Sequence, residues 1–188
     1  MFILSGKNIP KFKIVEILNR GGIVIMPCDT IYGFVGIVPD TAERLNSIKK
    51  RKQKQGYLQL ILEDWLPEIT PKSIESSLVS LCPGTLTFIV QSRRGPTAAV
   101  RIPEDPFLVD LLRSIGKPLY STSVNRSGKD ILYRARDIIN EFGGEVDAFI
   151  NRGDLPGRKP STILDVTSRP YRIIRAGACS VPDAYLTE

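Results

Sequence analysis

The chain has 188 residues, of which 42% are hydrophobic and 24% charged, a length and composition typical of one globular domain. Lys and Arg number 26 against 20 Asp and Glu, so the net charge is +6. This charge favours anionic ligands such as nucleotides, inorganic phosphate or RNA, although a mildly basic protein without such a ligand has the same balance. The sequence contains no histidine, which excludes Ser-His-Asp and Cys-His nucleophilic systems and a His-ligated metal.

The three cysteines, Cys28, Cys82 and Cys179, are far apart, and none forms a C-x-x-C pair. We therefore expect neither a disulfide framework nor a zinc site, and we expect a reducing, cytoplasmic location. The segment from Met1 to Pro10 has no apolar stretch long enough for a signal peptide. No segment approaches the roughly 18 apolar residues of a membrane span, so we expect no membrane partner.

Hydrophobic periodicity and turn residues predict alternating helices and strands. Asp40 and Glu43 have the spacing of a capping box, and the helix that they begin is expected to end in the basic run from Lys49. In chain order the prediction is helix 12–19, strand 23–26, strand 34–38, helix 40–48, strand 58–62, helix 74–81, strand 86–90, strand 98–102, helix 107–115, strand 118–121, helix 134–142, strand 148–150, strand 163–166 and strand 171–174.

Some predicted strands follow one another directly, which indicates a mixed sheet rather than a purely parallel one. No repeat, low-complexity tract or linker divides the chain. We therefore expect a single α/β domain over residues 1–188, with a core of about 8–182 and a tail after Pro182 that is loosely attached.

The usual phosphate-binding loops are missing from the sequence. Ser127-Gly128-Lys129 lacks the upstream part of a P-loop, and no G-x-G-x-x-G opens a helix. Any nucleotide must therefore be held by another arrangement.

Short polar residues follow an apolar strand in Pro27-Cys28-Asp29-Thr30-Ile31-Tyr32-Gly33, where α/β proteins often place ligand-binding loops. The alternative is a turn in which Asp29 and Thr30 satisfy backbone groups. The pair Lys49-x-Arg51 concentrates positive charge at a helix end. Such a pair is suited to binding the triphosphate of a nucleotide. The alternative is that the two cations only interact favourably with the helix dipole.

Three further segments combine polar side chains with strand ends. Arg101 directly follows an apolar strand and is suited to bidentate binding of a carboxylate or phosphate, or to a structural ion pair. The hydroxyls and amide of residues 121–128, Ser-Thr-Ser-Val-Asn-Arg-Ser-Gly, favour ligand binding over a simple polar turn. Ser161-Thr162 and Arg175-Ala176-Gly177 repeat this pattern more weakly.

Taken in order, these segments resemble the YrdC-like family of threonylcarbamoyl-AMP synthases. The family typically has a P-T-D-T-x-Y-G loop, K-x-R, a P-G-x-x-T turn, R-[IV]-P, S-x-N-x-S-G, an S-T pair and a final R-x-G. All seven occur here in that order between Pro27 and Gly177. The resemblance implies a twisted mixed β-sheet with flanking helices around a basic concave cleft.

The resemblance also implies roles for the residues at matching positions. It assigns catalysis to Lys49, Arg51, Ser123 and Asn125. It assigns ATP binding to Lys49, Arg51, Thr85, Thr87, Ser123, Asn125, Ser127 and Arg175. It assigns threonine binding to Thr30, Tyr32, Arg101, Ser161 and Thr162. It implies no metal ligand from the protein, because Mg²⁺ would arrive on the phosphates of ATP.

The chain departs from the family pattern at several positions. Cys28 stands where Thr is usual, and Thr85 replaces the second Pro of P-G-P. After K-x-R, Lys52 replaces a Pro, and Lys54 or Gln55 stands near a usual Lys or His. These changes leave room for a diverged member with altered activity, whereas the intact Ser123-Val124-Asn125 indicates that function is not wholly lost.

The implied reaction joins L-threonine, bicarbonate and ATP into L-threonylcarbamoyladenylate and pyrophosphate. The product would pass to a threonylcarbamoyl-transferase partner for N6-threonylcarbamoyladenosine modification of tRNA. The alternative is a non-catalytic paralogue whose basic cleft binds double-stranded RNA, tRNA or the ribosome, although an aromatic content of 7% offers few stacking platforms. A reactive-cysteine enzyme based on Cys28 is disfavoured because no histidine can serve as its base.

Overall fold

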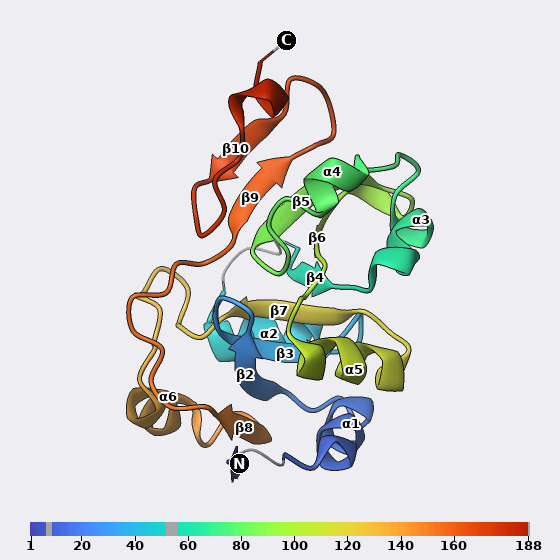
Figure 1. The fold of residues 1–188 in the computed structure, drawn as a ribbon. Helices are drawn as coiled ribbons and strands as arrows, with labels where there is room; N and C mark the ends of the chain where they lie inside the picture. Colours follow the sequence, from blue (N-terminus) through green and yellow to red (C-terminus); the bar gives the residue numbers. More distant parts are fainter. Residues whose placement is uncertain (7–8, 52–55, 188) are drawn as a thin grey trace.

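The computed structural model describes residues 1–6, 9–51 and 56–187. Lys52, Lys54 and Gln55, where the sequence departs from the family pattern, lie outside these residues. The chain forms a single-domain α/β fold with a mixed sheet and flanking helices, as predicted (Figure 1).

The elements are β1 Phe2–Ser5, α1 Lys11–Asn19, β2 Val24–Cys28, β3 Ile31–Ile37, α2 Ala42–Lys49, β4 Leu58–Leu60, η1 Glu63–Trp65, α3 Leu66–Ile69, α4 Ser76–Val79, β5 Leu86–Ser92, β6 Gly95–Arg101, α5 Pro106–Ile115, β7 Leu119–Ser123, α6 Ala135–Phe142, β8 Ala148–Asn151, β9 Thr162–Asp165, β10 Arg172–Arg175 and η2 Asp183–Tyr185.

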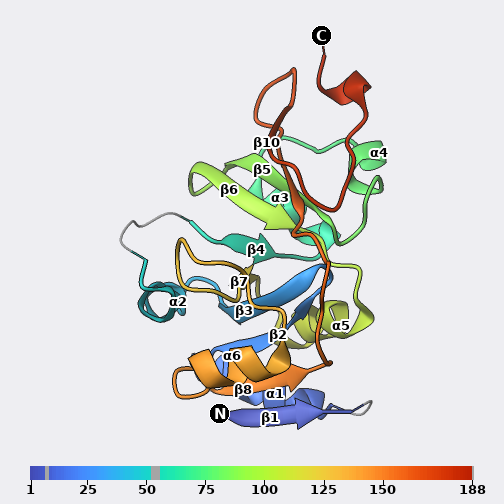
Figure 2. The ribbon, with the colours of Figure 1, turned by 90° about the vertical axis from the view of Figure 1, so that its left-hand side faces the viewer.

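The described strands form one sheet in the order β1-β8-β2-β3-β7-β4-β6-β5-β9-β10. The pairs β1/β8, β2/β8, β4/β6 and β5/β9 are parallel, and the other neighbours are antiparallel. The sheet twists strongly from the N-terminal strands at one end to β9 and β10 at the other (Figure 2). Strands distant in sequence therefore carry the predicted motifs to a shared central region.

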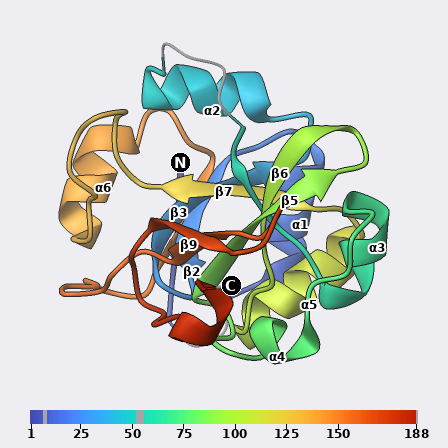
Figure 3. The ribbon, with the colours of Figure 1, turned by 90° about the horizontal axis from the view of Figure 1, so that it is seen from above.

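Helices cover both faces of the central strands, which explains why these strands are apolar on both sides. Along β2, alternate side chains point to opposite faces: Val24 and Met26 join the core under α1 and α5, and Ile25 joins the core under α2 and α6. A third apolar cluster fills the space between β5, β6, β9 and the short helices α3 and α4. Seen from above, α2 lies on the side of β7 away from α5, and α6 lies beyond one end of β7 (Figure 3).

Two local predictions were wrong at the ends of elements. The helix predicted from a capping box begins only at Ala42, and its N-cap, Thr41, makes no side-chain cap bond because its hydroxyl donates to the carbonyl of Ile37. The tail after Pro182 is packed rather than loose, because the N–H of Tyr171 donates to the carbonyl of Tyr185. The sequence also missed β1, a short strand whose place depends on parallel pairing with β8.

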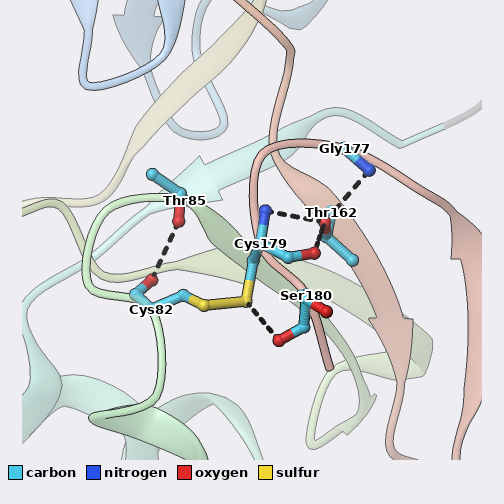
Figure 4. Close-up of a disulfide and its surroundings, with 6 residues drawn as sticks. All are labelled: Cys82, Thr85, Thr162, Gly177, Cys179 and Ser180. Carbon is cyan, nitrogen blue, oxygen red and sulfur yellow. Dashed lines mark hydrogen bonds between the residues drawn. A yellow bond between two sulfur atoms is a disulfide. The ribbon is translucent and has the colours of Figure 1, made fainter. Parts of the chain in front are cut away.

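The expectation of unpaired cysteines was also wrong, because Cys82 and Cys179 form a disulfide across 97 residues (Figure 4). Cys82 precedes β5, and Cys179 lies in the loop that follows β10. Parallel pairing of Leu86 in β5 with Thr162 in β9 brings the two regions together. Spacing along the chain could not indicate this proximity, because it arises from the order of strands in the sheet.

None of the helices in the described part of the chain combines the length and the apolar character that crossing a bilayer requires.

The packing of α6 on the sheet gives a test of the core. Phe142 is fully buried, with its ring centroid 4.9 Å from that of Phe34. Phe142→Ala should lower the free energy of unfolding by about 3–5 kcal/mol because it leaves a cavity. The matched variant Phe12→Ala removes a ring that is 68% exposed and should change stability by less than about 0.5 kcal/mol. Urea denaturation measures both; similar losses would contradict this account of the core.

Candidate functional site

A pocket of about 250 Å³ brings together most of the polar segments singled out in the sequence. It receives residues from the β2–β3 turn, from β5, β6, β7, β9 and β10, and from the segments after α2 and before β4. Its lining consists of Cys28, Thr30, Ile31, Tyr32, Gly33, Arg51, Gly56, Tyr57, Leu58, Thr87, Ala99, Arg101, Ser121, Thr122, Ser123, Pro160, Ser161, Ile163 and Arg175.

The predicted site residues divide into two groups. Those in the pocket lining are Thr30, Tyr32, Arg51, Thr87, Arg101, Ser123, Ser161 and Arg175. Those outside the lining are Lys49, Thr85, Asn125, Ser127 and Thr162. The second group contains side chains that hold the pocket's loops, as their hydrogen bonds show below.

Arg101 is the most unusual member of the lining, because its guanidinium is buried, with 3% exposure, at the end of β6. One Nη donates to the carbonyl of Cys28 at 3.0 Å, and the other lies 3.5 Å from the hydroxyl of Thr30. Its Nε has no hydrogen-bond partner, and no carboxylate of the described residues forms an ion pair with it. Burial lowers the pKa of Arg101. A buried cation that faces a pocket in this way is suited to an anionic ligand.

Asp29 fixes the turn that presents Thr30 and the carbonyl of Cys28 to Arg101. Its backbone is left-handed, with φ 58°, and its Oδ1 accepts from the N–H groups of Glu104 at 2.9 Å and Asp105 at 2.7 Å. This residue therefore joins the β2–β3 turn to the segment that follows Arg101. The reading of Asp29 as a residue that satisfies backbone groups, which the sequence left open, agrees with these bonds.

Lys49, Ser123 and Asn125 form one hydrogen-bonded cluster. The ammonium of Lys49 donates to the carbonyls of Ser123 at 2.7 Å and Asn125 at 3.0 Å and to Oδ1 of Asn125 at 2.9 Å. Oδ1 of Asn125 also accepts from the Ser123 hydroxyl at 2.7 Å, and its Nδ2 donates to the carbonyl of Lys129 at 2.6 Å. Lys49 and Asn125 thus hold the 123–129 loop without lining the pocket themselves. Ser123 is the member of the cluster that lines the pocket.

Arg126 holds the outer side of the same loop. Its guanidinium is ion-paired with Glu141 at 2.7 Å and Glu145 at 2.5 Å, donates to the carbonyl of Ile48, and lies 4.5 Å from the ring centroid of Phe142. The sequence motifs assign no role to Arg126. Its single clue was a cation between the two motif residues Asn125 and Ser127, which does not by itself indicate partners on α6.

The opposite wall of the pocket is a chain of contacts from β5 to β10. The Thr87 and Ser161 hydroxyls lie 2.8 Å apart. Arg175 donates to the carbonyl of Ser161 from Nη at 2.8 Å and from Nε at 3.2 Å. Partial burial of its guanidinium, and then repulsion from Arg101, lower the pKa of Arg175, although the residue as a whole is exposed. An anion between these two guanidiniums would relieve that repulsion.

Three predicted binding hydroxyls are occupied by backbone groups. The Thr162 hydroxyl donates to the carbonyl of Cys179 at 2.6 Å and accepts from the N–H groups of Gly177 and Cys179. The Thr85 hydroxyl donates to the carbonyl of Cys82 at 3.3 Å. The Tyr32 hydroxyl donates to the carbonyl of Gly153 at 2.7 Å, although its ring lines the pocket. These hydroxyls shape the pocket through the segments that they hold.

Arg51 stacks on an aromatic residue that the sequence analysis did not single out. Its guanidinium lies 4.8 Å from the ring centroid of Tyr57, and both residues line the pocket. The Tyr57 hydroxyl in turn donates to Oδ1 of Asn46 at 2.7 Å. Tyr57 could have been recognised only from the fold, because it precedes β4 and carries no motif.

The described residues contain no group of three or more His, Cys, Asp and Glu side chains placed to hold a metal ion. The pocket walls offer guanidinium, hydroxyl and backbone groups instead. This donor set suits an anionic ligand and gives a metal ion no carboxylate ligands in that part of the chain.

The family model Sua5/YciO/YrdC, described as "Telomere recombination", matches residues 16–177. The chain belongs to this family. The resemblance inferred from seven short motifs is thereby confirmed.

Solved structures of low sequence identity share the fold. E. coli YciO is 24% identical with a TM-score of 0.81, over 95% of this chain and 96% of YciO. P. abyssi Sua5 complexed with L-threonine is 22% identical with a TM-score of 0.84, over 94% of this chain and 58% of Sua5. Full-length HypF in a phosphate- and nucleotide-bound form is 17% identical with a TM-score of 0.75, over 90% of this chain and 29% of HypF.

The environment of Lys49 predicts a pH-dependent stability. Burial, with a further contribution from Arg51, lowers the pKa of Lys49 to about 8. Between pH 8 and about 10.5 the unfolded lysine holds a proton that the folded lysine has lost, so raising the pH in this range favours folding. The free energy of unfolding of the wild type, relative to that of Lys49→Gln, should therefore rise by up to about 1.4 kcal/mol per pH unit in this range. Urea denaturation of both proteins at pH 7.5 and 9.5 measures this difference, and an unchanged difference would contradict the lowered pKa.

Proposed function

We propose that this protein is an L-threonylcarbamoyladenylate synthase, which joins L-threonine, bicarbonate and ATP and releases pyrophosphate for N6-threonylcarbamoyladenosine modification of tRNA. The observation that carries the proposal is the buried guanidinium of Arg101, which lacks an ion-pair partner among the described residues and faces a pocket that also contains Arg51 and Arg175. Separate cationic groups in one pocket suit a pair of substrates that each carry negative charge.

The proposed reaction requires positioning and charge neutralisation more than covalent help from the protein. The amine of threonine must combine with bicarbonate to give a carbamate, with loss of one oxygen of bicarbonate as water. A carbamate oxygen then attacks the α-phosphorus of ATP and displaces pyrophosphate. Both reacting groups are anionic, so side chains that offset their repulsion lower the barrier. Guanidinium groups suit this role because they remain protonated and donate two parallel hydrogen bonds.

We assign different arginines of the pocket to the two substrates. Arg101 would bind the threonine carboxylate beside Thr30, and Arg51 and Arg175 would bind the phosphates of ATP. Ser123 would orient a phosphate or carbamate oxygen by redirecting to it the hydroxyl that otherwise donates to Oδ1 of Asn125, in the loop that Lys49 holds. Two structural relatives support this class of ligand, since one is a Sua5 complexed with L-threonine and the other a HypF bound to phosphate and nucleotide.

Mg²⁺ fits this site as an ion carried by ATP. The described residues that line the pocket include no Asp or Glu side chain, so any Mg²⁺ would be held by the phosphate oxygens and water. The ion would supply additional neutralisation of phosphate charge. The proposed partner that accepts the product is a threonylcarbamoyl-transferase.

Substrate dependence tests the reaction. Pyrophosphate release from ATP should require L-threonine and bicarbonate together, because the attacking group is their carbamate. Labelled threonine should appear in an adenylate detected by mass spectrometry. Turnover without threonine, or equal turnover with L-serine, would exclude the proposed reaction. Binding of double-stranded RNA or tRNA without any binding of ATP would instead favour the alternative of a non-catalytic RNA-binding protein.

A pair of arginine variants tests this assignment. Arg101→Gln should weaken L-threonine binding by about 10- to 100-fold and ATP binding much less, because one charge-assisted contact to the carboxylate is lost. Arg175→Gln should show the reverse order. Arg113→Gln, on the exposed face of α5, is the matched control and should change neither. Calorimetric titration of the folded variants measures both affinities, and equal losses for both ligands would contradict the assignment.

A further inference from the structure

Arg175 reaches the pocket from the most exposed strand of the sheet. All four residues of β10 are exposed, and β10 lies at the edge of the described sheet with β9 as its neighbour. The register between β9 and β10 is irregular between Ile173 and Arg175. Few packing contacts therefore fix the strand that positions this cation, and other interactions must hold it in place.

The loop after Arg175 provides this support by folding back on the start of β9 (Figure 4). The N–H groups of Gly177 and Cys179 donate to the Thr162 hydroxyl at 3.0 and 3.1 Å. The N–H of Ala178 donates to the carbonyl of Pro160 at 2.9 Å. Gly177 packs so closely that a Cβ there would collide with the carbonyl oxygen of Pro160. This loop is therefore a bracket that connects Arg175 to Ser161 and Thr162.

The disulfide joins the bracket to the other side of the pocket wall. Cys179 is bonded to Cys82, whose carbonyl accepts from the N–H of Thr85 at 3.1 Å. The carbonyl of Thr85 in turn accepts from the N–H of Thr162 at 3.0 Å. The disulfide and these hydrogen bonds thus form a closed ring of contacts that includes Thr162. This ring lies next to Ser161, whose carbonyl accepts from Arg175.

The two cysteine residues differ in exposure. Cys179 is buried, with 7% exposure, whereas Cys82 is half-buried and lines a second, open groove of about 200 Å³ with Glu63, Pro83 and Glu104. A small thiol can therefore approach the bond from the side of Cys82. The third cysteine, Cys28, lies on the wall of the first pocket, where burial raises its pKa to about 11, so it does not compete in exchange.

We propose that the Cys82–Cys179 bond is a redox latch that sets the position of Arg175 and thereby regulates ligand binding in the first pocket. A dithiol reductant attacks the disulfide by thiol–disulfide exchange; its two thiols become a disulfide, and Cys82 and Cys179 become thiols, with two electrons and two protons transferred. The bracket then rests on hydrogen bonds alone and opens more often. The identity of the affected ligand, a nucleotide phosphate, rests on the proposed function, but the release of the bracket does not.

The test compares the oxidised and reduced full-length protein by three measurements. Alkylation and mass spectrometry establish the state of each cysteine. Hydrogen exchange of residues 172–181 reports opening of the bracket, and calorimetry with ATP and Mg²⁺ reports binding. Reduction should accelerate exchange at Gly177–Cys179 and weaken ATP binding by about tenfold, the effect expected for one lost charge-assisted contact. Exchange in β2 and β3 should not change.

Variants separate the latch from general effects of the reductant. The double variant Cys82→Ser with Cys179→Ser should behave like the reduced protein and should not respond to reductant. Cys28→Ser should keep the response of hydrogen exchange and ATP affinity to the reductant, because the thiol of Cys28 is not part of the disulfide. This holds even where the substitution itself changes the ATP affinity of both states. Thr162→Val should accelerate exchange in the bracket even when the protein is oxidised, since it removes the acceptor for two N–H groups.

Three outcomes would overturn the latch: free thiols at Cys82 and Cys179 in protein prepared without reductant, complete reduction with unchanged exchange at residues 172–181, or opening of the bracket with unchanged ATP affinity. If reduction opens the bracket and neither state binds ATP, the proposed function fails, whereas the control of the bracket by the disulfide stands. The failure of one is thus distinguishable from the failure of the other.

Discussion

Arg101 carries a charge in the protein interior, and the arrangement of the pocket depends on how that charge is accommodated. A buried cation is costly unless hydrogen bonds replace its water. The Cys28 carbonyl and the Thr30 hydroxyl provide part of this replacement. They occupy these positions because Asp29 adopts a left-handed conformation and accepts two N–H groups from the segment after Arg101. The guanidinium also lines the pocket, and its Nε has no hydrogen-bond partner among the described residues.

The family motifs support this pocket by two different routes. Some motif side chains, such as Arg51, Ser123 and Ser161, line the cavity. Others, such as Asn125 and Thr162, use their polar groups to fix the backbone of neighbouring loops. A motif can therefore require a residue either for its contact with a ligand or for the hydrogen bonds that make that contact possible.

The two walls of the pocket differ in how firmly they are held. The wall formed by β3 and β7 lies in the middle of the sheet, between helices on both faces, and Arg126 ties its loop to α6. The wall formed by β9 and β10 lies at the edge, where β10 is exposed. A covalent bond is most useful on the second wall, because few buried contacts there restrict local opening.

The sequence by itself determined the fold class, the approximate place of most helices and strands, and the family. Local signals suffice for these because apolar periodicity reflects burial, and glycine and proline mark turns. The motifs also named most of the polar pocket lining, including Arg101 and Arg175, since polar residues at strand ends gather at one region of a sheet.

Only the tertiary structure decided which polar groups face the pocket and which hold its loops. The disulfide, the partners of Arg126, the packing of the tail and the place of β1 all join residues that are distant in sequence. Nothing in the local pattern of Cys82 or Thr162 indicates their neighbours, because those neighbours are set by the parallel pairing of β5 with β9. A sequence does not show whether the hydroxyl of a Ser or Thr residue bonds to a backbone amide or lies in an open pocket. The order and pairing of the strands decide this, because they determine which residues become its neighbours.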